Sequence, residues 1–257
     1  MVAIALAAGA SPLIGAGFAL LHRPSTVLMS VALGFAAGAL IGTAAFEMVP
    51  RSIELAPPAL AIAAFTVGYL SLYAFDLLLH GGQTAGGRAQ QRRRVAAYRR
   101  WHKPVASETT VLAGATLIEQ VVEGVTIGAG ASIDPALAGL VALAVALDNL
   151  GEGASIVELI REEQRGVRVW ARSLRWTGAM GVATTLATLV GFLFLRDMPG
   201  PLIGGILAFG AGGLFYLTLT KLIPEGESRQ YEQSAALAAG AGLVLVMLLG
   251  LVLRPSA

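Results

Sequence analysis

The sequence contains no cysteine and has few charged residues. The absence of cysteine excludes disulfides and thiolate metal ligands. Only 13% of the 257 residues are charged, whereas a soluble domain carries about 25%. A soluble core of this size could not be covered by so few charges, but a lipid bilayer removes that need. The scarcity of charge therefore predicts a membrane protein.

The sequence is rich in long apolar stretches. Mean hydropathy is +0.72, and apolar runs of about 20 residues, the length that crosses a bilayer, recur along the chain. We expect an all-α integral membrane protein with one transmembrane domain over residues 1–257. Its eight predicted spans lie near residues 2–21, 27–49, 57–79, 105–130, 135–160, 173–195, 201–223 and 233–253. No basic residue precedes the first run, so we interpret it as a helix and not as a signal peptide.

The distribution of Lys and Arg predicts how the protein is oriented. With the N-terminus outside, most of the 18 basic residues fall in cytoplasmic loops, including seven in 88–103 and five in 161–175. This distribution satisfies the positive-inside rule, with Lys221 assigned to the inner end of the seventh span. We therefore expect a multi-pass protein of the cell membrane with both termini outside. The basic loop at residues 81–104 is interpreted as a segment that contacts anionic lipid, not nucleic acid.

The second and seventh predicted spans share a pattern. In each, a run of small residues contains a glycine, Gly38 or Gly212, and a proline follows it twelve residues later, Pro50 or Pro224. The predicted topology sends these two spans through the membrane in opposite directions. We therefore expect the first three and the last three spans to be related as an inverted repeat around spans four and five, a plan of many transporters. A packing face repeated by chance is the alternative.

Four acids lie in the middle of the fourth and fifth predicted spans. Each of these spans reads acid, amide, two small or apolar residues, Glu and Gly. The polar members of the two patterns are Glu119, Gln120 and Glu123 in one span and Asp148, Asn149 and Glu152 in the other. Acids at positions i and i+4 share one face of a helix, so each span presents two carboxylates one turn apart.

These acids need a compensating partner. An ionised acid at the bilayer centre costs at least about 2.5–3.5 kcal/mol, and neither span contains a Lys or Arg. A bound cation, protonation of the acids, or a lining of water would each meet this need. A divalent metal fits the first option best, because oxygen donors converging from facing helices form metal sites in bundles. Protonated acids hydrogen-bonded between the two helices are the purely structural alternative.

The motifs together resemble those of the ZIP (Zrt/Irt-like protein) family of divalent metal transporters. Most of the chain takes part in the resemblance: residues 6–16 resemble the first helix of the family, and residues 34–38 with Glu47-Met48-Val49-Pro50 resemble the second. Residues 142–153 are similar to the metal-binding pattern H-N-x-P-E-G, which recurs more loosely at 119–124. The resemblance implies transport of a divalent cation into the cytoplasm, through a mononuclear or binuclear site between helices four and five.

By position, the resemblance assigns metal ligation to Glu119, Glu123, Asp148 and Glu152, and a contribution to a second metal position to Gln120 and Asn149. The chain departs from the family where acids replace both motif histidines and Val122 and Gly151 replace both motif prolines. Thr184 lies where the sixth helix usually brings a Glu. An all-oxygen site is harder and suits Mn, Fe, Mg or Ca relatively better, although zinc still binds carboxylates. The missing sixth-helix acid favours a single metal.

We therefore predict a transporter of Zn, Fe, Mn, Cd or a similar divalent ion, with the metal as substrate and no organic cofactor. Membrane lipid is an expected partner, and the oligomeric state is left open between a monomer and a homodimer. Two other functions remain open, namely a transporter or channel for protons or monovalent ions, and a metal-sensing membrane protein without transport activity. An enzyme is not expected, because Ser107–Thr110 has no matching histidine in reach.

Overall fold

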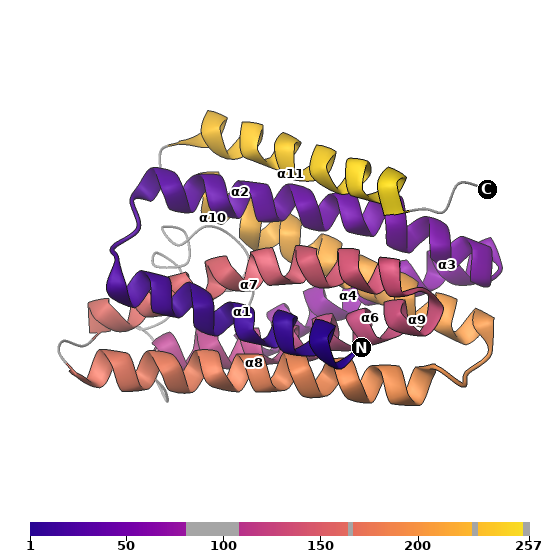
Figure 1. Cartoon of the computed structure of the whole chain (residues 1–257), viewed down its shortest axis with the longest axis horizontal. Helices are drawn as coiled ribbons and strands as arrows, with labels where there is room; N and C mark the ends of the chain where they lie inside the picture. Colours follow the sequence, from indigo (N-terminus) through magenta and orange to yellow (C-terminus); the bar gives the residue numbers. More distant parts are fainter. Residues whose placement is uncertain (81–107, 164–166, 228–230, 254–257) are drawn as a thin grey trace.

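The computed structural model describes residues 1–80, 108–163, 167–227 and 231–253, so the predicted basic loop at 81–104 lies outside the described residues. Every regular element in these ranges is a helix, and the long helices run side by side along one axis (Figure 1). The elements are α1 (Val2–Leu21), α2 (Thr26–Gly42), η1 (Thr43–Met48), α3 (Val49–Leu55), α4 (Pro58–His80), α6 (Glu108–Ile133), α7 (Pro135–Glu163), α8 (Val167–Leu195), α9 (Gly200–Leu217), η2 (Thr218–Leu222), α10 (Ile223–Glu227) and α11 (Glu232–Leu253).

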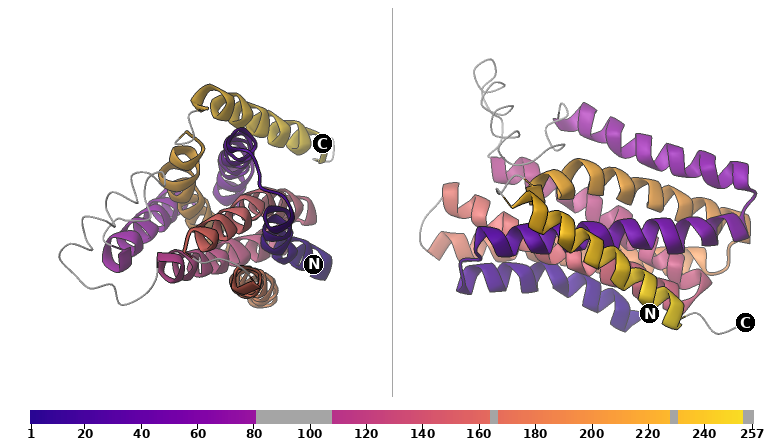
Figure 2. Two further views of the ribbon diagram at one scale, coloured as in Figure 1. Left: turned by 90° about the vertical axis from the view of Figure 1, so that its left-hand side faces the viewer. Right: turned by 90° about the horizontal axis from the view of Figure 1, so that it is seen from above.

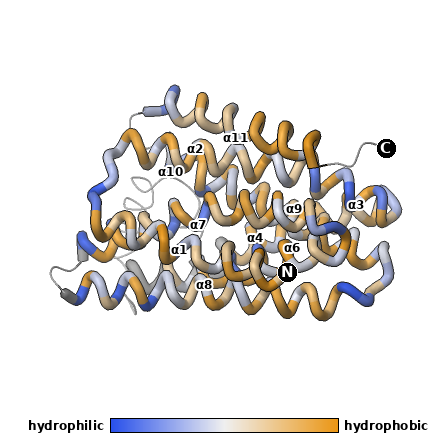
Figure 3. Tube along the Cα trace, in the orientation of Figure 1, coloured by the Kyte–Doolittle hydropathy of each residue, from blue (hydrophilic) through white to orange (hydrophobic). Residues whose placement is uncertain are grey.

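The protein is an all-α integral membrane protein. Seven of its helices are long and apolar enough to cross a membrane, and Figure 3 shows hydrophobic residues along their middle parts with hydrophilic ones gathered toward the ends. Apolar side chains cover the outer surface, as at Leu237 and Val252, because lipid is the solvent there. Helix α6 is not among the seven, so the predicted count of eight spans is not confirmed by this criterion.

The helices form a central bundle flanked by two pairs. Helices α1, α6, α7 and α8 pack closely on one another, while α2 pairs with α11 and α4 pairs with α9 (Figure 2). Helix α2 also contacts α7, and α9 also contacts α6, which joins the pairs to the bundle. The two helices that carry the predicted site are therefore interior elements of the fold.

Local sequence explains where several of these helices begin. The Ser25 hydroxyl accepts a hydrogen bond from the Leu28 N–H at 3.2 Å and so caps the start of α2. The Asp134 carboxylate accepts from the Ala136 N–H at 3.0 Å, with Pro135 as the first residue of α7. Asp134 thus caps the start of α7 and places the turn between α6 and α7, the two helices of the predicted site.

The flanking pairs make equivalent contacts. A Cβ atom added at Gly38 would lie 1.8 Å from the carbonyl oxygen of Ala239, and one added at Gly212 would lie 2.0 Å from that of Phe65. Gly212 follows Gly38 by 174 positions, and Ala239 follows Phe65 by the same interval. A second pair of contacts is related by this interval, that of Gly68 with Phe209 and that of Gly242 with Phe35. The α2–α11 and α4–α9 pairs are thus packed in the same way, in support of the predicted repeat.

The central bundle has its own equivalent contacts. A Cβ added at Gly124 on α6 would lie 2.7 Å from the carbonyl oxygen of Thr184 on α8, and one added at Gly153 on α7 would lie 2.1 Å from that of Pro12 on α1. The helices therefore cross closely at Gly124 and at Gly153. Each glycine follows the last glutamate of its acidic pattern, so each crossing lies directly beside the predicted site.

Candidate cation-binding site

Helices α6 and α7 present their acidic faces to each other. All six side chains predicted for the site are buried, with at most 7% of any residue exposed: Glu119, Gln120, Glu123, Asp148, Asn149 and Glu152. The carboxylate of Glu123 interacts electrostatically with those of Asp148, Glu152 and Glu119. The four carboxylates are therefore near enough to influence one another electrostatically.

Two amides join the helices at the centre of this site. Gln120 Nε2 donates to Asn149 Oδ1 at 2.6 Å and to Glu152 Oε2 at 3.0 Å. Gln120 Oε1 in turn accepts a hydrogen bond from the hydroxyl of Thr184 on α8. Both amide oxygens are thus already engaged within the protein, which reduces their capacity to bind a second metal.

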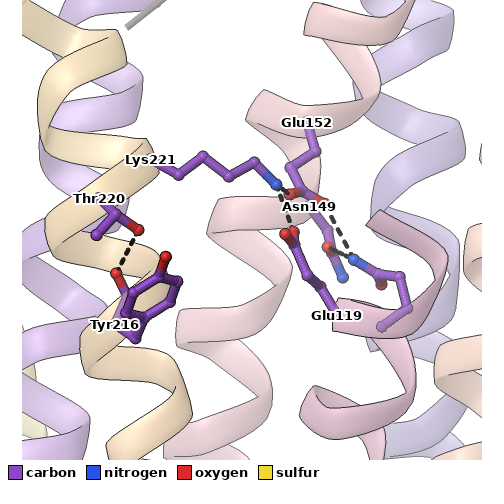
Figure 4. A network of polar contacts seen from close by, with 7 residues as sticks. Glu119, Asn149, Glu152, Tyr216, Thr220 and Lys221 are labelled. Carbon is purple, nitrogen blue, oxygen red and sulfur yellow. Dashed lines mark hydrogen bonds and ion pairs between the residues drawn. The ribbon is translucent and has the colours of Figure 1, made fainter. Parts of the chain in front are cut away.

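A lysine lies among the carboxylates. The ammonium group of Lys221, in η2, forms ion pairs with Glu119 on α6 and Glu152 on α7. Figure 4 shows its side chain extending from its own helix toward these two acids. Neither predicted acid-bearing span contains a basic residue, and the partner comes instead from a third helix. Lys221 is a residue of this cluster that the sequence prediction missed.

The position of Lys221 in the repeat is a feature of the sequence from which its role as a partner of the acids could have been predicted. Glu47 precedes Pro50 by three residues, Lys221 precedes Pro224 by three, and both lie in π-helical segments, η1 and η2. Glu47 is therefore the equivalent of Lys221 in the other repeat. A cation at a place where the repeat has an acid, inside an apolar run, indicates a specific anionic partner.

Several polar atoms of the site have no hydrogen-bond partner. Within the described residues these buried atoms include Glu123 Oε2, Asp148 Oδ1 and Asn149 Nδ2. A buried carboxylate oxygen without a donor or cation is costly, so Lys221 does not complete the site. Among the residues that the structure describes, no three His, Asp or Glu side chains are arranged as a ready-made metal site.

Other acids suggested by the sequence lie away from this cluster. Glu47 lines a cavity of about 240 Å³ together with Arg51, Glu54 and Asp134. It packs beside Gly250 of α11, where an added Cβ would lie 2.1 Å from Glu47 Oε1. Helix α3, which follows η1, and helix α10, which follows η2, lie toward opposite ends of the bundle (Figure 1), so Glu47 and Lys221 lie toward opposite ends as well.

Comparison with known proteins gives a consistent result. No established family model matches the chain. It is 26% identical over 225 residues to the zinc transporter ZupT of Escherichia fergusonii, which covers 86% of this chain and 84% of that one. It is also 26% identical to ZupT of Escherichia coli O7:K1 and 25% identical to ZupT of Salmonella heidelberg, with the same coverage. This likeness over most of both chains agrees with the all-helical membrane fold and the paired acidic motifs, and it supports the resemblance to the ZIP family.

Proposed function

We propose that the protein transports divalent metal cations across the membrane into the cytoplasm, through the carboxylate site between α6 and α7. The observation that carries this proposal is the presence of a positive group, the Lys221 ammonium, between acids of both helices in the interior of a membrane protein. The site thus already accepts a cation. Relatives described as zinc transporters over most of their length support the same class of substrate.

The chemistry of the site suits a hard divalent ion. Every candidate donor is an oxygen from Glu or Asp, and such donors bind Mn, Fe, Mg and Ca as well as zinc. On the α8 side of the site, the Thr184 hydroxyl donates a hydrogen bond to Gln120 Oε1. Neither of these two residues supplies a carboxylate for a second metal. We propose that a single metal is bound between α6 and α7.

The repeated packing supports alternating access. Inverted repeats allow one group of helices to rock against the other around a fixed site, and the central bundle and the flanking pairs are two such groups. Because basic residues concentrate in the loops assigned to the inside, we propose that both termini lie outside and that flux is inward.

Transport in liposomes tests the proposal. Purified protein in proteoliposomes should admit Zn, Mn, Fe or Cd, and the double variant Glu123→Gln, Glu152→Gln should lose most of this flux. Asp197→Asn is a suitable control, because Asp197 is exposed beside Arg196 at the far end of α8. Flux by the double variant equal to that of the wild type would contradict the proposal.

Lys221 also favours a second candidate, a membrane protein that senses or binds metal without moving it. A cation fixed in the protein could hold the site closed to flux. This candidate predicts metal binding in detergent and no flux in liposomes. A third outcome, flux driven by a pH step with no metal bound, would instead indicate a proton or monovalent-ion carrier.

A further inference from the structure

We propose that Lys221 is a tethered cation that holds the metal position while the site is empty, and that a divalent ion binds by displacing it. The inference rests on the proposed function, because it assigns the residue with which the substrate competes. Lys221 thus becomes a determinant of affinity and of the preference for divalent ions.

The lysine reaches the site from a different part of the fold. Its ion pairs connect η2, which continues the α9 flanking helix, to Glu119 and Glu152 of the central bundle. The ammonium thus bridges the same two helices that a metal between α6 and α7 would bridge. The Lys221 ammonium group thus occupies the position between α6 and α7 that a metal ion would occupy.

The fit of the ammonium to the site is incomplete. A lysine carries one charge and three N–H donors, against four carboxylates. Glu123 Oε2 and Asp148 Oδ1 are left without a hydrogen-bond partner in the part of the chain that the structure describes. A divalent ion brings twice the charge and can be approached by oxygens from several sides. A divalent ion can therefore also bind the carboxylate oxygens that the lysine leaves unpaired.

The lysine has a route away from the site. Its side chain is 28% exposed, whereas those of Glu119 and Glu152 are 9% and 5% exposed. A long aliphatic stem allows a lysine to withdraw its charge toward water while its carbons stay packed. The equivalent residue of the other repeat, Glu47, lies in a separate cavity, so repeat symmetry does not require a side chain at this position to reach the site.

Tethering explains a preference for divalent ions. A linked group competes at a high effective concentration, of the order of millimolar or more. A monovalent ion would exchange one positive charge for another and gain no charge by displacing the lysine. A divalent ion that replaces the ammonium group adds one positive charge to the site. The attraction of the four carboxylates therefore favours a divalent ion over the lysine, and does not favour a monovalent ion.

The first experiment measures binding of Zn and, separately, Mn to the purified full chain in detergent by isothermal titration calorimetry. Lys221→Gln should bind each metal at least about tenfold more tightly than the wild type, because the competing charge is gone. Lys221→Arg, which keeps the charge, should remain within a few-fold of the wild type. Arg196→Gln is the matched control, since it removes one exposed positive charge outside the site.

The second experiment needs no variant. The sequence holds two lysines, Lys103 and Lys221, so labelling with an amine-reactive ester can be followed at each by peptide mass spectrometry. Labelling of Lys221 should rise several-fold when Zn or Mn is added, while that of Lys103 serves as the internal reference. A rise at Lys221 would show displacement even if the glutamine variant failed to fold.

The outcomes separate the two proposals. Metal binding that is equal in the wild type and Lys221→Gln, with labelling of Lys221 unchanged by metal, overturns the tethered cation and leaves the proposed transport intact. Binding by Lys221→Gln alone would show that metal does not displace Lys221 in the wild type, and it contradicts both the displacement and transport by the wild type. Failure of both proteins to bind Zn or Mn contradicts both proposals.

Discussion

Gln120 and Asn149 hold the same place in the acidic patterns of α6 and α7, and their side chains meet, with Gln120 Nε2 2.6 Å from Asn149 Oδ1. Contacts between equivalent residues occur where a two-fold axis crosses a structure. The pseudo-symmetry of the fold therefore passes through the carboxylate site, and the amide pair marks its centre.

The amide pair leads to a prediction about stability. Gln120→Leu should lower the free energy of unfolding by roughly 1–3 kcal/mol for each polar group left unpaired, because Asn149, Glu152 and Thr184 each lose a hydrogen bond. The change is measured by heating the fluorescently tagged protein in detergent and using gel filtration to determine the fraction that remains folded at each temperature. A midpoint equal to that of the wild type would mean that water replaces Gln120 without cost.

The helix crossing beside the site gives a second prediction. Gly153→Ala should strongly reduce stability, since its Cβ would lie 2.1 Å from the Pro12 carbonyl oxygen. Gly139→Ala, on the same helix, meets no atom within 4 Å and should be neutral or stabilising by up to about 1 kcal/mol. The two melting temperatures should move in opposite directions or differ clearly. Equal effects would argue against tight α1–α7 packing.

The ion pair between Lys221 and Glu152 can be measured by a double-mutant cycle. Lys221→Met alone leaves buried carboxylates without their cation, and Glu152→Gln in the same chain should restore part of the lost stability. A coupling free energy of about 1–3 kcal/mol is expected. The exposed pair of Arg51 and Glu54 serves as the comparison, with an expected coupling of about 0.2–1 kcal/mol. A smaller coupling for the Lys221 pair would contradict its place in the site.

The topology can be tested with single cysteines, because the sequence contains none. Ser25→Cys lies in the turn after α1, and Asp197→Cys lies between α8 and α9; both positions are exposed. With both termini outside, a membrane-impermeant maleimide added to intact cells should label residue 197 and not residue 25. The reverse pattern would invert the proposed orientation, and labelling of both would show leakage.

The sequence predicted the general features because they depend on local composition. Apolar runs set the helices, and Pro and Asp residues such as Asp134 set their boundaries. The i and i+4 spacing predicts that each pair of acids shares one helix face, and all four acids are buried in the structure. Thr184 was placed at the site by its position in the sixth helix and does contact Gln120 there.

Lys221 was missed for a physical reason. Its backbone lies near the end of an apolar run, where a lysine normally extends to the membrane surface. The direction of its side chain depends on the acids of two helices that are distant in sequence, and a charge count along the chain carries no such information. The amide contacts of Gln120 were missed for the same reason, since three separate helices create them.

The order of synthesis gives the Lys221 ion pairs a meaning for biogenesis. Helices reach the membrane in the order in which the ribosome makes them, and Lys221 follows Glu119 by 102 residues and Glu152 by 69. The two glutamates are thus delivered to the membrane before the lysine that neutralises them has been made. A nascent chain cut before residue 218 would therefore carry Glu119 and Glu152 without the ammonium group that pairs with both of them.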